Sequence, residues 1–283
     1  MARELVIRLE LSGGESLHLG ARGRRACRSL HDLSVMIDSR CVSAPLDSCG
    51  SILFDGELRS EYTGLPRRGG VARTGMSSDG RFAVLTNGSY LPYQSGEWPM
   101  MLRLVMLSGL SRGQSIFPVH GALLETGGGH GVLLFGRSGI GKTTTVSRYR
   151  AAGGVCRSDD FNLCQWDGRN LIVYPMPTCS YYCVNWTPQL RYSYSPGVVI
   201  DGLWWLQRGD RESVVRAPEH EWLAALAHAI SFHWIWVFRS LPAKPKREFG
   251  ERVLDLALTL KAAFAPESLL ASLDGDIMDV FRR

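Results

Sequence analysis

The chain has 283 residues, of which 45% are hydrophobic and 21% are charged, and its formal net charge at pH 7 is +5. This length accommodates one large domain or two modest domains, each with a buried core. The composition is that of an ordinary soluble globular protein. The positive charge is mild and spread along the chain, so it gives no indication of a nucleic-acid partner.

The cysteines and the apolar segments indicate in which cellular compartment the protein is expected. The seven cysteines are odd in number, and they show neither a C-x-x-C pair nor a His/Cys ligand spacing, so we expect reduced thiols. The opening residues MARELVIRLELSGGES place acidic residues too early, and an apolar run too short, for a signal peptide. The apolar run 222–238 contains His228, Ser231 and His233, which predicts a buried helix and not a membrane span. We therefore expect a cytoplasmic protein without membrane association.

Residues 1–98 are predicted to form a smaller β-rich region. Segments 4–11, 51–58 and 81–86 are strand-like runs separated by Gly, Ser and Asp, and the first of them alternates with a period of two. Only residues 28–38 suggest a helix, and 65–80 are dominated by turn residues. The sequence LSGGE at Leu11–Glu15 resembles an ABC-transporter signature but precedes any nucleotide loop, so we interpret it as the turn that closes the first strand.

Residues 99–283 are predicted to form a second, α/β domain. The expected elements in chain order are a helix at 98–110, a hairpin at 117–136, a helix at 142–152 ended by Gly153 and Gly154, a strand at 155–160, a hairpin at 161–177 with Asp167 and Gly168 in its turn, a loop at 178–196, a strand at 197–206, a helix at 218–239, a basic link at 242–252 and an amphipathic helix at 253–264.

A glycine-rich loop lies between the second strand of the 117–136 hairpin and the helix after it. Gly136, Gly141, Lys142 and Thr143 fit the pattern G-x-x-x-x-G-K-[ST] completely, and Lys142 is the only lysine before position 244 in a chain whose basic residues are mostly arginine. Backbone N–H groups and the helix N-terminus would hold phosphate oxygens, Lys142 would reach the β and γ phosphates, and Thr143 would hold Mg²⁺. The expected nucleotide contacts are Gly136, Ser138, Gly139, Ile140, Gly141, Lys142, Thr143 and Thr144.

Other nucleotide-loop classes fit less well. A GTPase would carry N-K-x-D, and no lysine of this chain stands in that setting. Asp201, after the hydrophobic run VVI, is a candidate for a second ATPase motif, although an ordinary buried strand with an acid at its end is the favoured interpretation.

Two adjacent carboxylates, Asp159 and Asp160, compete for the same role and come earlier in the chain. They follow Lys142 by one helix and one short strand. If the strands before the loop and before the acids are parallel neighbours, their carboxyl ends lie side by side at one rim. One acid could then bind Mg²⁺ and the other could accept a hydroxyl proton. A pair of capping residues on a surface turn is the alternative.

The stretch from Phe117 to Val173 resembles the catalytic core of the HPr serine kinase family, which are P-loop kinases with a phosphoenolpyruvate-carboxykinase-like core. The resemblance rests on the V-H-G opening of the hairpin, the glycine-rich loop and the adjacent Asp pair. The following YPMPTCSYY is similar to an element of small HPr-kinase-like proteins of peptide-modification clusters, such as ScmC of the SynChlorMet cassette and lasso-peptide kinases, with Cys179 in place of a Trp. The HPr kinase signature with a Mg-binding Glu is absent, so the resemblance does not extend to HPr as substrate or to phosphorolysis.

The resemblance implies a mixed sheet, ATP and Mg²⁺ as ligands, His120 near the phosphates, Lys142 and Thr143 on phosphate and metal, and Asp159 or Asp160 as base, with Asp160 as metal ligand beside Thr143. From the residues alone, a His in a hairpin strand is more often a core residue, and it is the resemblance that makes a role of His120 at the phosphates equally plausible. A homo-oligomer is compatible with the family.

Arg191, Arg208 and Arg239 are candidates for a further cation at the phosphates, and none of the three stands out. The Tyr- and Trp-rich segment 178–196 could dock a peptide, or pack a core or an oligomer contact.

Two functions remain open from the sequence. The first is an ATP-dependent kinase that phosphorylates a Ser or Thr hydroxyl of a peptide or small protein, within a peptide-modification pathway. The second is a nucleotide-binding accessory protein that uses ATP as a conformational ligand for a partner enzyme and transfers nothing.

Overall fold

The computed structural model describes residues 4–44, 46, 49–55, 63–65, 73–77, 81–86, 115–176, 194, 196–232, 243–272 and 275–281. The chain divides into two compact units. The first comprises Met1–Phe117, Thr187–Ser195 and Trp236–Pro242, and the second comprises Pro118–Trp186, Pro196–Ile235 and Ala243–Arg283. The boundary predicted at residue 98, the helix predicted at 98–110 and most of the predicted loop 178–196 lie outside the described residues.

The first unit is built on a seven-stranded mixed sheet with the order β3-β1-β2-β4-β7-β6-β5. Its strands are β1 (Glu4–Glu10), β2 (Ser16–Arg22), β3 (Cys41–Val42), β4 (Ser51–Asp55), β5 (Thr63–Leu65), β6 (Arg73–Met76) and β7 (Phe82–Thr86). β2, β4 and β7 run parallel, and the other pairings are antiparallel. The strands predicted at 4–11 and 81–86 are confirmed within one residue at their ends, and the strand predicted at 51–58 is confirmed as far as Asp55, since 56–58 lie outside the described residues. The interpretation of 65–80 as turns is wrong for β6, which is paired on both sides and therefore does not need a strong strand pattern of its own.

The turn and the helix of the first unit follow the sequence pattern. LSGGE closes β1 onto β2 as predicted: a 3₁₀ turn (η1, Ser12–Gly14) lies within it, and the Leu11 N–H donates to the Glu15 carbonyl at 2.9 Å. Helix α1 (Arg24–Met36) packs on β1, β2 and β4. Its buried side chains recur at the helical period, as Ala26, Leu30 and Leu33. Tyr194, from the segment before β13, accepts a hydrogen bond from the Glu10 N–H at 3.1 Å.

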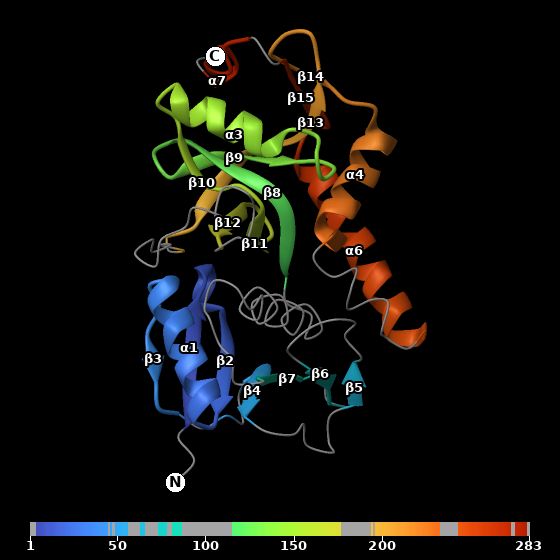
Figure 1. Ribbon diagram of the computed structural model, residues 1–283. Coiled ribbons are helices and arrows are strands. Elements are labelled where there is room, and N and C mark those ends of the chain that lie inside the picture. Colours follow the sequence, from blue (N-terminus) through green and yellow to red (C-terminus); the bar gives the residue numbers. More distant parts are fainter. Residues whose placement is uncertain are drawn as a thin grey trace. The chain divides into compact units, whose positions relative to one another are not determined.

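The second unit contains an eight-stranded mixed sheet (Figure 1). Its strands are β8 (Ile116–Gly127), β9 (His130–Phe135), β10 (Val155–Ser158), β11 (Phe161–Trp166), β12 (Leu171–Pro175), β13 (Val198–Arg208), β14 (Ser213–Arg216) and β15 (Glu267–Ala271). The pairing order is β10-β8-β11-β12-β13-β15-β14, and β9 pairs with both β8 and β13. The pairings of β8, β11, β12, β13 and β9 therefore close a ring, which requires the sheet to curl. This agrees with the α/β class and the mixed sheet expected from the sequence.

The arrangement of β8, β9 and β10 corrects one expectation. We expected the strand before the glycine-rich loop and the strand before the Asp pair to be parallel neighbours. Instead β8 lies between them and is antiparallel to both, with Gly121 opposite Phe135 of β9 and Leu123 opposite Ser158 of β10. Two strands antiparallel to the same partner run in the same direction, so β9 and β10 still end at the same edge of the sheet.

Helices α3 (Lys142–Ala151), α4 (Glu219–Ser231), α6 (Ala243–Ala263) and α7 (Met278–Phe281) complete the second unit. α3 ends as predicted, because Gly153 adopts φ 90° and the Gly154 N–H donates to the Tyr149 carbonyl. α4 packs on β9, β13 and α6, with Trp222 fully buried edge-to-face on Phe135 at a centroid distance of 5.5 Å. Figure 1 shows α4 running alongside α6.

The basic link predicted at 242–252 is wrong, because this segment forms the first half of α6. Pro245 lies in the first turn, where backbone N–H groups have no helical partner. Arg247 and Glu251 form an exposed pair at 2.8 Å with the (i, i+4) spacing that supports a helix. The charged residues of this segment therefore support a helix and do not mark a link between helices.

The C-terminal segment is tied to α3 by Arg148. Its guanidinium donates to the carbonyls of Ser272 and Gly275 and to Glu212, whose carboxylate also accepts from the Ser272 hydroxyl at 2.7 Å. Desolvation raises the pKa of Glu212, but the hydrogen bonds from Ser272 and Arg148 together outweigh it and leave the pKa below its usual value. The strands β14 and β15 and helix α7 were missed from the sequence, because they are short and depend on these long-range contacts.

Two further expectations concern thiols and membranes. Of the cysteines that the structure describes, Cys27, Cys41, Cys49, Cys156 and Cys164, all are free thiols. Cys179 and Cys183 lie outside the described residues. No described helix combines the length and apolar character that crossing a bilayer requires.

Two glycines give opposite predictions for the same substitution. A Cβ at Gly121 would lie 2.6 Å from the Leu134 carbonyl oxygen, whereas a Cβ at the exposed Gly250 in α6 would meet nothing within 4 Å. We expect Gly121→Ala to lower the free energy of unfolding by about 1–3 kcal/mol through overpacking. Gly250→Ala should raise it by about 0.5–1 kcal/mol through helix propensity. Urea denaturation measures both, and an equal effect of the two variants would contradict the described packing of β8 on β9.

Candidate functional site

The glycine-rich loop, residues 136–143, connects β9 to α3 in a conformation that its glycines permit. Gly139 and Gly141 have φ angles of +79° and +118°, which favour glycine. At Gly136 a Cβ would lie 3.2 Å from the Leu206 carbonyl oxygen. The Ile140 side chain packs against the hydrophobic core of this unit and so anchors the loop. The loop is thereby bent so that it leads directly into the N-terminus of α3.

Lys142, the first residue of α3, has a buried side chain that turns back into the loop. Its Nζ donates to the carbonyls of Gly136 at 3.0 Å and Arg137 at 3.1 Å. Burial lowers the pKa of Lys142 to about 8, and the nearby charges of Asp160 and Asp159 act in the opposite direction. The ammonium is thus held in place at a position where an anionic ligand would raise its pKa again.

Asp159 and Asp160 lie in the turn between β10 and β11, and a buried network fixes that turn. The Gly121 N–H donates to the Asp160 carbonyl at 3.0 Å, and the Asn162 side-chain amide donates to the Gly121 carbonyl at 2.8 Å. The Ser158 hydroxyl donates to the Asn162 side-chain oxygen. Both Ser158 and Asn162 are buried. The two acids therefore occupy a turn that is hydrogen-bonded to β8, and Asp159 is buried, which does not fit the alternative of a capping pair on a surface turn.

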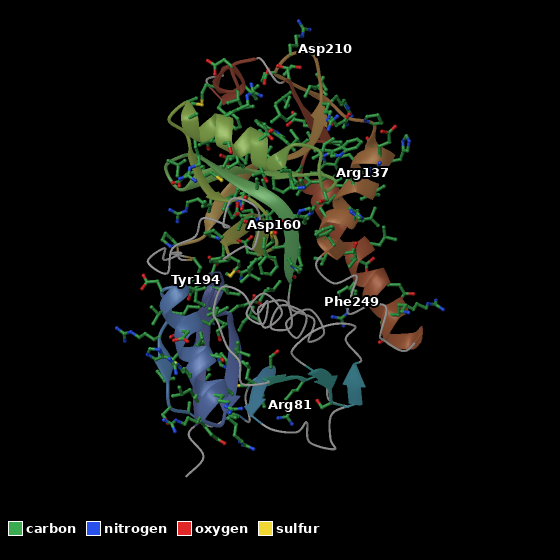
Figure 2. The ribbon with its side chains drawn as sticks, in the orientation of Figure 1. Arg81, Arg137, Asp160, Tyr194, Asp210 and Phe249 are labelled. Carbon is green, nitrogen blue, oxygen red and sulfur yellow. The ribbon has the colours of Figure 1, made fainter. Side chains whose placement is uncertain are left out.

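His120, on β8, reaches the same turn. Its Nε2 lies 2.9 Å from Asp160 Oδ1, and its side chain is only 5% exposed. Desolvation lowers the pKa of His120, and the hydrogen bond to Asp160 acts in the opposite direction. A neutral imidazole that approaches a carboxylate through Nε2 donates its Nε2–H to it. Figure 2 marks Asp160 beside β8 and Arg137 in the glycine-rich loop.

These side chains line one pocket of about 390 Å³. Its lining residues are His120, Ser138, Gly139, Gly141, Lys142, Thr143, Thr144, Asp159 and Asp160. The structure therefore brings together most of the residues singled out in the sequence. Gly136 and Ile140 belong to the loop without lining the pocket, since the first packs on Leu206 and the second faces the core.

Other sequence candidates lie elsewhere. Asp201 does not end its strand: β13 continues to Arg208, and the exposed Asp201 side chain pairs with His130 at 2.8 Å. Neither Asp201 nor the exposed Arg208 lines the pocket. Arg191 and Arg239 are outside the described residues. The sequence analysis missed Phe232, whose ring stacks on His120, because its apolar segment indicated only helix packing.

The donor set of the pocket fits a phosphate ligand with Mg²⁺. The glycine conformations leave the backbone of the loop unobstructed by side chains, and Lys142 supplies a fixed cation. Thr143, Asp159 and Asp160 supply hydroxyl and carboxylate oxygens, which are the ligands that Mg²⁺ prefers. Within the described part of the chain, no group of three or more His, Cys, Asp and Glu side chains is arranged to hold a metal alone. Mg²⁺ typically shares its coordination between one or two protein groups and substrate phosphates.

The buried ammonium gives a pH prediction that needs no ligand. The folded pKa of Lys142, about 8, is below the unfolded value of 10.5, so the unfolded state binds more protons between these pH values. The contribution of Lys142 to the free energy of unfolding should therefore increase as pH rises from 8 to 10.5, by an amount on the order of 3 kcal/mol. Lys142→Met should lack this gain. Urea denaturation across that range, compared as wild type minus variant, measures it, and a flat difference would show that the ammonium is not buried.

Comparison with known proteins places the chain in a family. A search of the curated proteins returned no match. The family model of SynChlorMet cassette protein ScmC matches residues 97–282, which is more than half of the chain and includes every residue that lines the pocket. The chain therefore belongs to the ScmC family of SynChlorMet cassette proteins.

Proposed function

We propose that this protein is an ATP-dependent kinase with an HPr-kinase-like site, and that it transfers the γ-phosphoryl group to a Ser or Thr hydroxyl of a peptide or small protein. The observation that carries the proposal is the convergence of Lys142, His120, Asp159 and Asp160 on one pocket beside the glycine-rich loop. A nucleotide-binding protein without chemistry needs the loop, the lysine and a ligand for Mg²⁺, but it has no need of a second carboxylate beside the terminal phosphate. The family name supports a place among peptide-modifying proteins.

Different parts of the site would bind the phosphates and the metal ion. The loop backbone and the N-terminus of α3 would hold the phosphates, and Lys142 would neutralise the terminal ones. Thr143 and Asp160 would hold Mg²⁺, which when bound neutralises charge on the phosphate oxygens. We assign Asp160 to the metal because His120 hydrogen-bonds to it in the manner of groups that orient metal-bound carboxylates.

The remaining acid, Asp159, would take the proton of the acceptor. A bond forms between the acceptor hydroxyl oxygen and the γ-phosphorus, the bond from that phosphorus to the bridging oxygen breaks, and ADP leaves. The hydroxyl proton passes to the Asp159 carboxylate. Most of the rate enhancement in such a transfer comes from positioning and charge stabilisation. A fixed turn at Asp159 and Asp160 supplies that positioning.

Variants of the two acids test this division. With γ-labelled ATP, Mg²⁺ and synthetic peptides from the reading frames next to this gene, we expect wild-type protein to label a peptide on Ser or Thr. Asp159→Asn should lower kcat by about 10²–10⁴-fold with ATP affinity retained, because the proton acceptor is lost. Asp160→Asn should instead raise the Mg²⁺ concentration needed for half-maximal ATP binding.

Asp201→Asn is the matched control, since it removes an exposed carboxylate of the same unit outside the pocket. It should leave transfer and binding unchanged. If ATP binds and no peptide becomes labelled, the accessory function is favoured over the kinase. If peptide labelling survives in both Asp159→Asn and Asp160→Asn, the proposed chemistry is wrong.

A further inference from the structure

An aromatic ring at the end of α4 lies flat against the imidazole of the site. Phe232 and His120 stack with a centroid distance of 4.0 Å and an interplanar angle of 16°. Phe232 directly follows α4, whereas His120 lies on β8, more than a hundred residues earlier in the chain. The contact therefore joins a helix end to a strand of the site.

The stack limits how the imidazole can turn. Partial rotation about the Cβ–Cγ bond tilts the imidazole and moves Nε2 away from its neighbour, and a parallel ring at van der Waals distance disfavours such tilted orientations. In the observed plane Nε2 lies 2.9 Å from Asp160 Oδ1. A rotation out of this plane would break both the stack and the hydrogen bond.

The helix that presents Phe232 is itself fixed. Trp222, one turn into α4, is fully buried edge-to-face on Phe135, the last residue of β9 before the glycine-rich loop. His228, in the last turn of α4, contacts the Phe232 ring edge-on at 5.9 Å. The Phe232 ring therefore extends from a helix that is packed against the sheet.

We infer that Phe232 is a positioning residue, which holds the His120 imidazole in the plane where its Nε2–H meets Asp160. The catalytic consequence rests on the proposed kinase function. The ring of Phe232 contacts the imidazoles of His120 and His228, and of these two only His120 lines the pocket, so we expect the effect of Phe232 on the reaction to pass through His120. The orientation of His120 itself does not depend on the proposed function and can be measured separately.

Nitrogen-15 NMR of histidine-labelled protein measures this orientation without turnover. The chain has seven histidines, and the His120 signals are identified by their loss in His120→Gln. We expect the pattern of the Nε2–H tautomer in wild type, a pattern averaged toward the other tautomer in Phe232→Leu, and the wild-type pattern in Phe232→Tyr, which keeps an aromatic ring. Phe281→Leu is the matched control, because Phe281 packs against Trp204 and Tyr149 away from the pocket. An unchanged pattern in Phe232→Leu, or an equal change in Phe281→Leu, would overturn the inference.

Kinetics then test the catalytic consequence. Phe232→Leu should lower kcat about tenfold, with KM for ATP changed by less than about twofold, because orientation is lost and nucleotide contacts are not. Phe232→Tyr should restore kcat. In a His120→Gln background Phe232→Leu should cause no further loss, since a residue that acts through His120 has nothing left to orient. Additive losses in this cycle would contradict the inference.

The two assays separate the possible failures. If the tautomer pattern changes as expected in a protein that transfers no phosphoryl group, the positioning role stands and the kinase proposal fails. If the protein is a kinase and its tautomer pattern is insensitive to Phe232→Leu, the kinase proposal stands and the positioning role is refuted.

Discussion

A buried ammonium group is the constraint on which the second unit depends. Lys142 is 6% exposed, and its Nζ is held by the carbonyls of Gly136 and Arg137. A buried charge is costly unless partners compensate it, and its depressed pKa records that cost. The nearby carboxylates of Asp159 and Asp160 compensate part of it, and the pocket beside it offers room for an anion that would supply more. The local structure trades stability for a cation in a fixed place, as functional sites commonly do.

The strand β8 is what brings this cation and the acids together. It pairs with β9, which leads into the glycine-rich loop, along one edge, and with β10, which leads into the Asp pair, along the other. β8 also carries His120, which contacts Asp160. The residue after His120 is Gly121, whose backbone N–H donates to the Asp160 carbonyl. Gly121 has no space for a side chain, because a Cβ would meet the Leu134 carbonyl oxygen. The adjacent histidine and glycine of the V-H-G sequence thus serve two purposes: one side chain reaches the acids, and the other residue permits close packing of β8 on β9.

Much of this site could be predicted from the sequence, because its signals are local. The spacing of Gly136, Gly141, Lys142 and Thr143 predicts a phosphate-binding loop between a strand and a helix. The two acids follow after that helix and one short strand. What the sequence could not show depends on contacts between distant segments. The insertion of β8 between β9 and β10, the strands β14 and β15, and the stack of Phe232 on His120 are pairings of this kind. The basic composition of the first half of α6 predicted a link, but these residues form a helix.

The central claim is that the Lys142 ammonium and the carboxylates of Asp159 and Asp160 act on one terminal phosphoryl group. A crystal structure of the full chain with Mg²⁺ and a non-hydrolysable ATP analogue tests it most directly. The account predicts the γ-phosphate in hydrogen-bond contact with Lys142, Mg²⁺ between that phosphate and the side chains of Thr143 and Asp160, and Asp159 facing the open side of the γ-phosphorus. A triphosphate whose terminal group points away from both acids, or a nucleotide bound outside this pocket, would contradict the account.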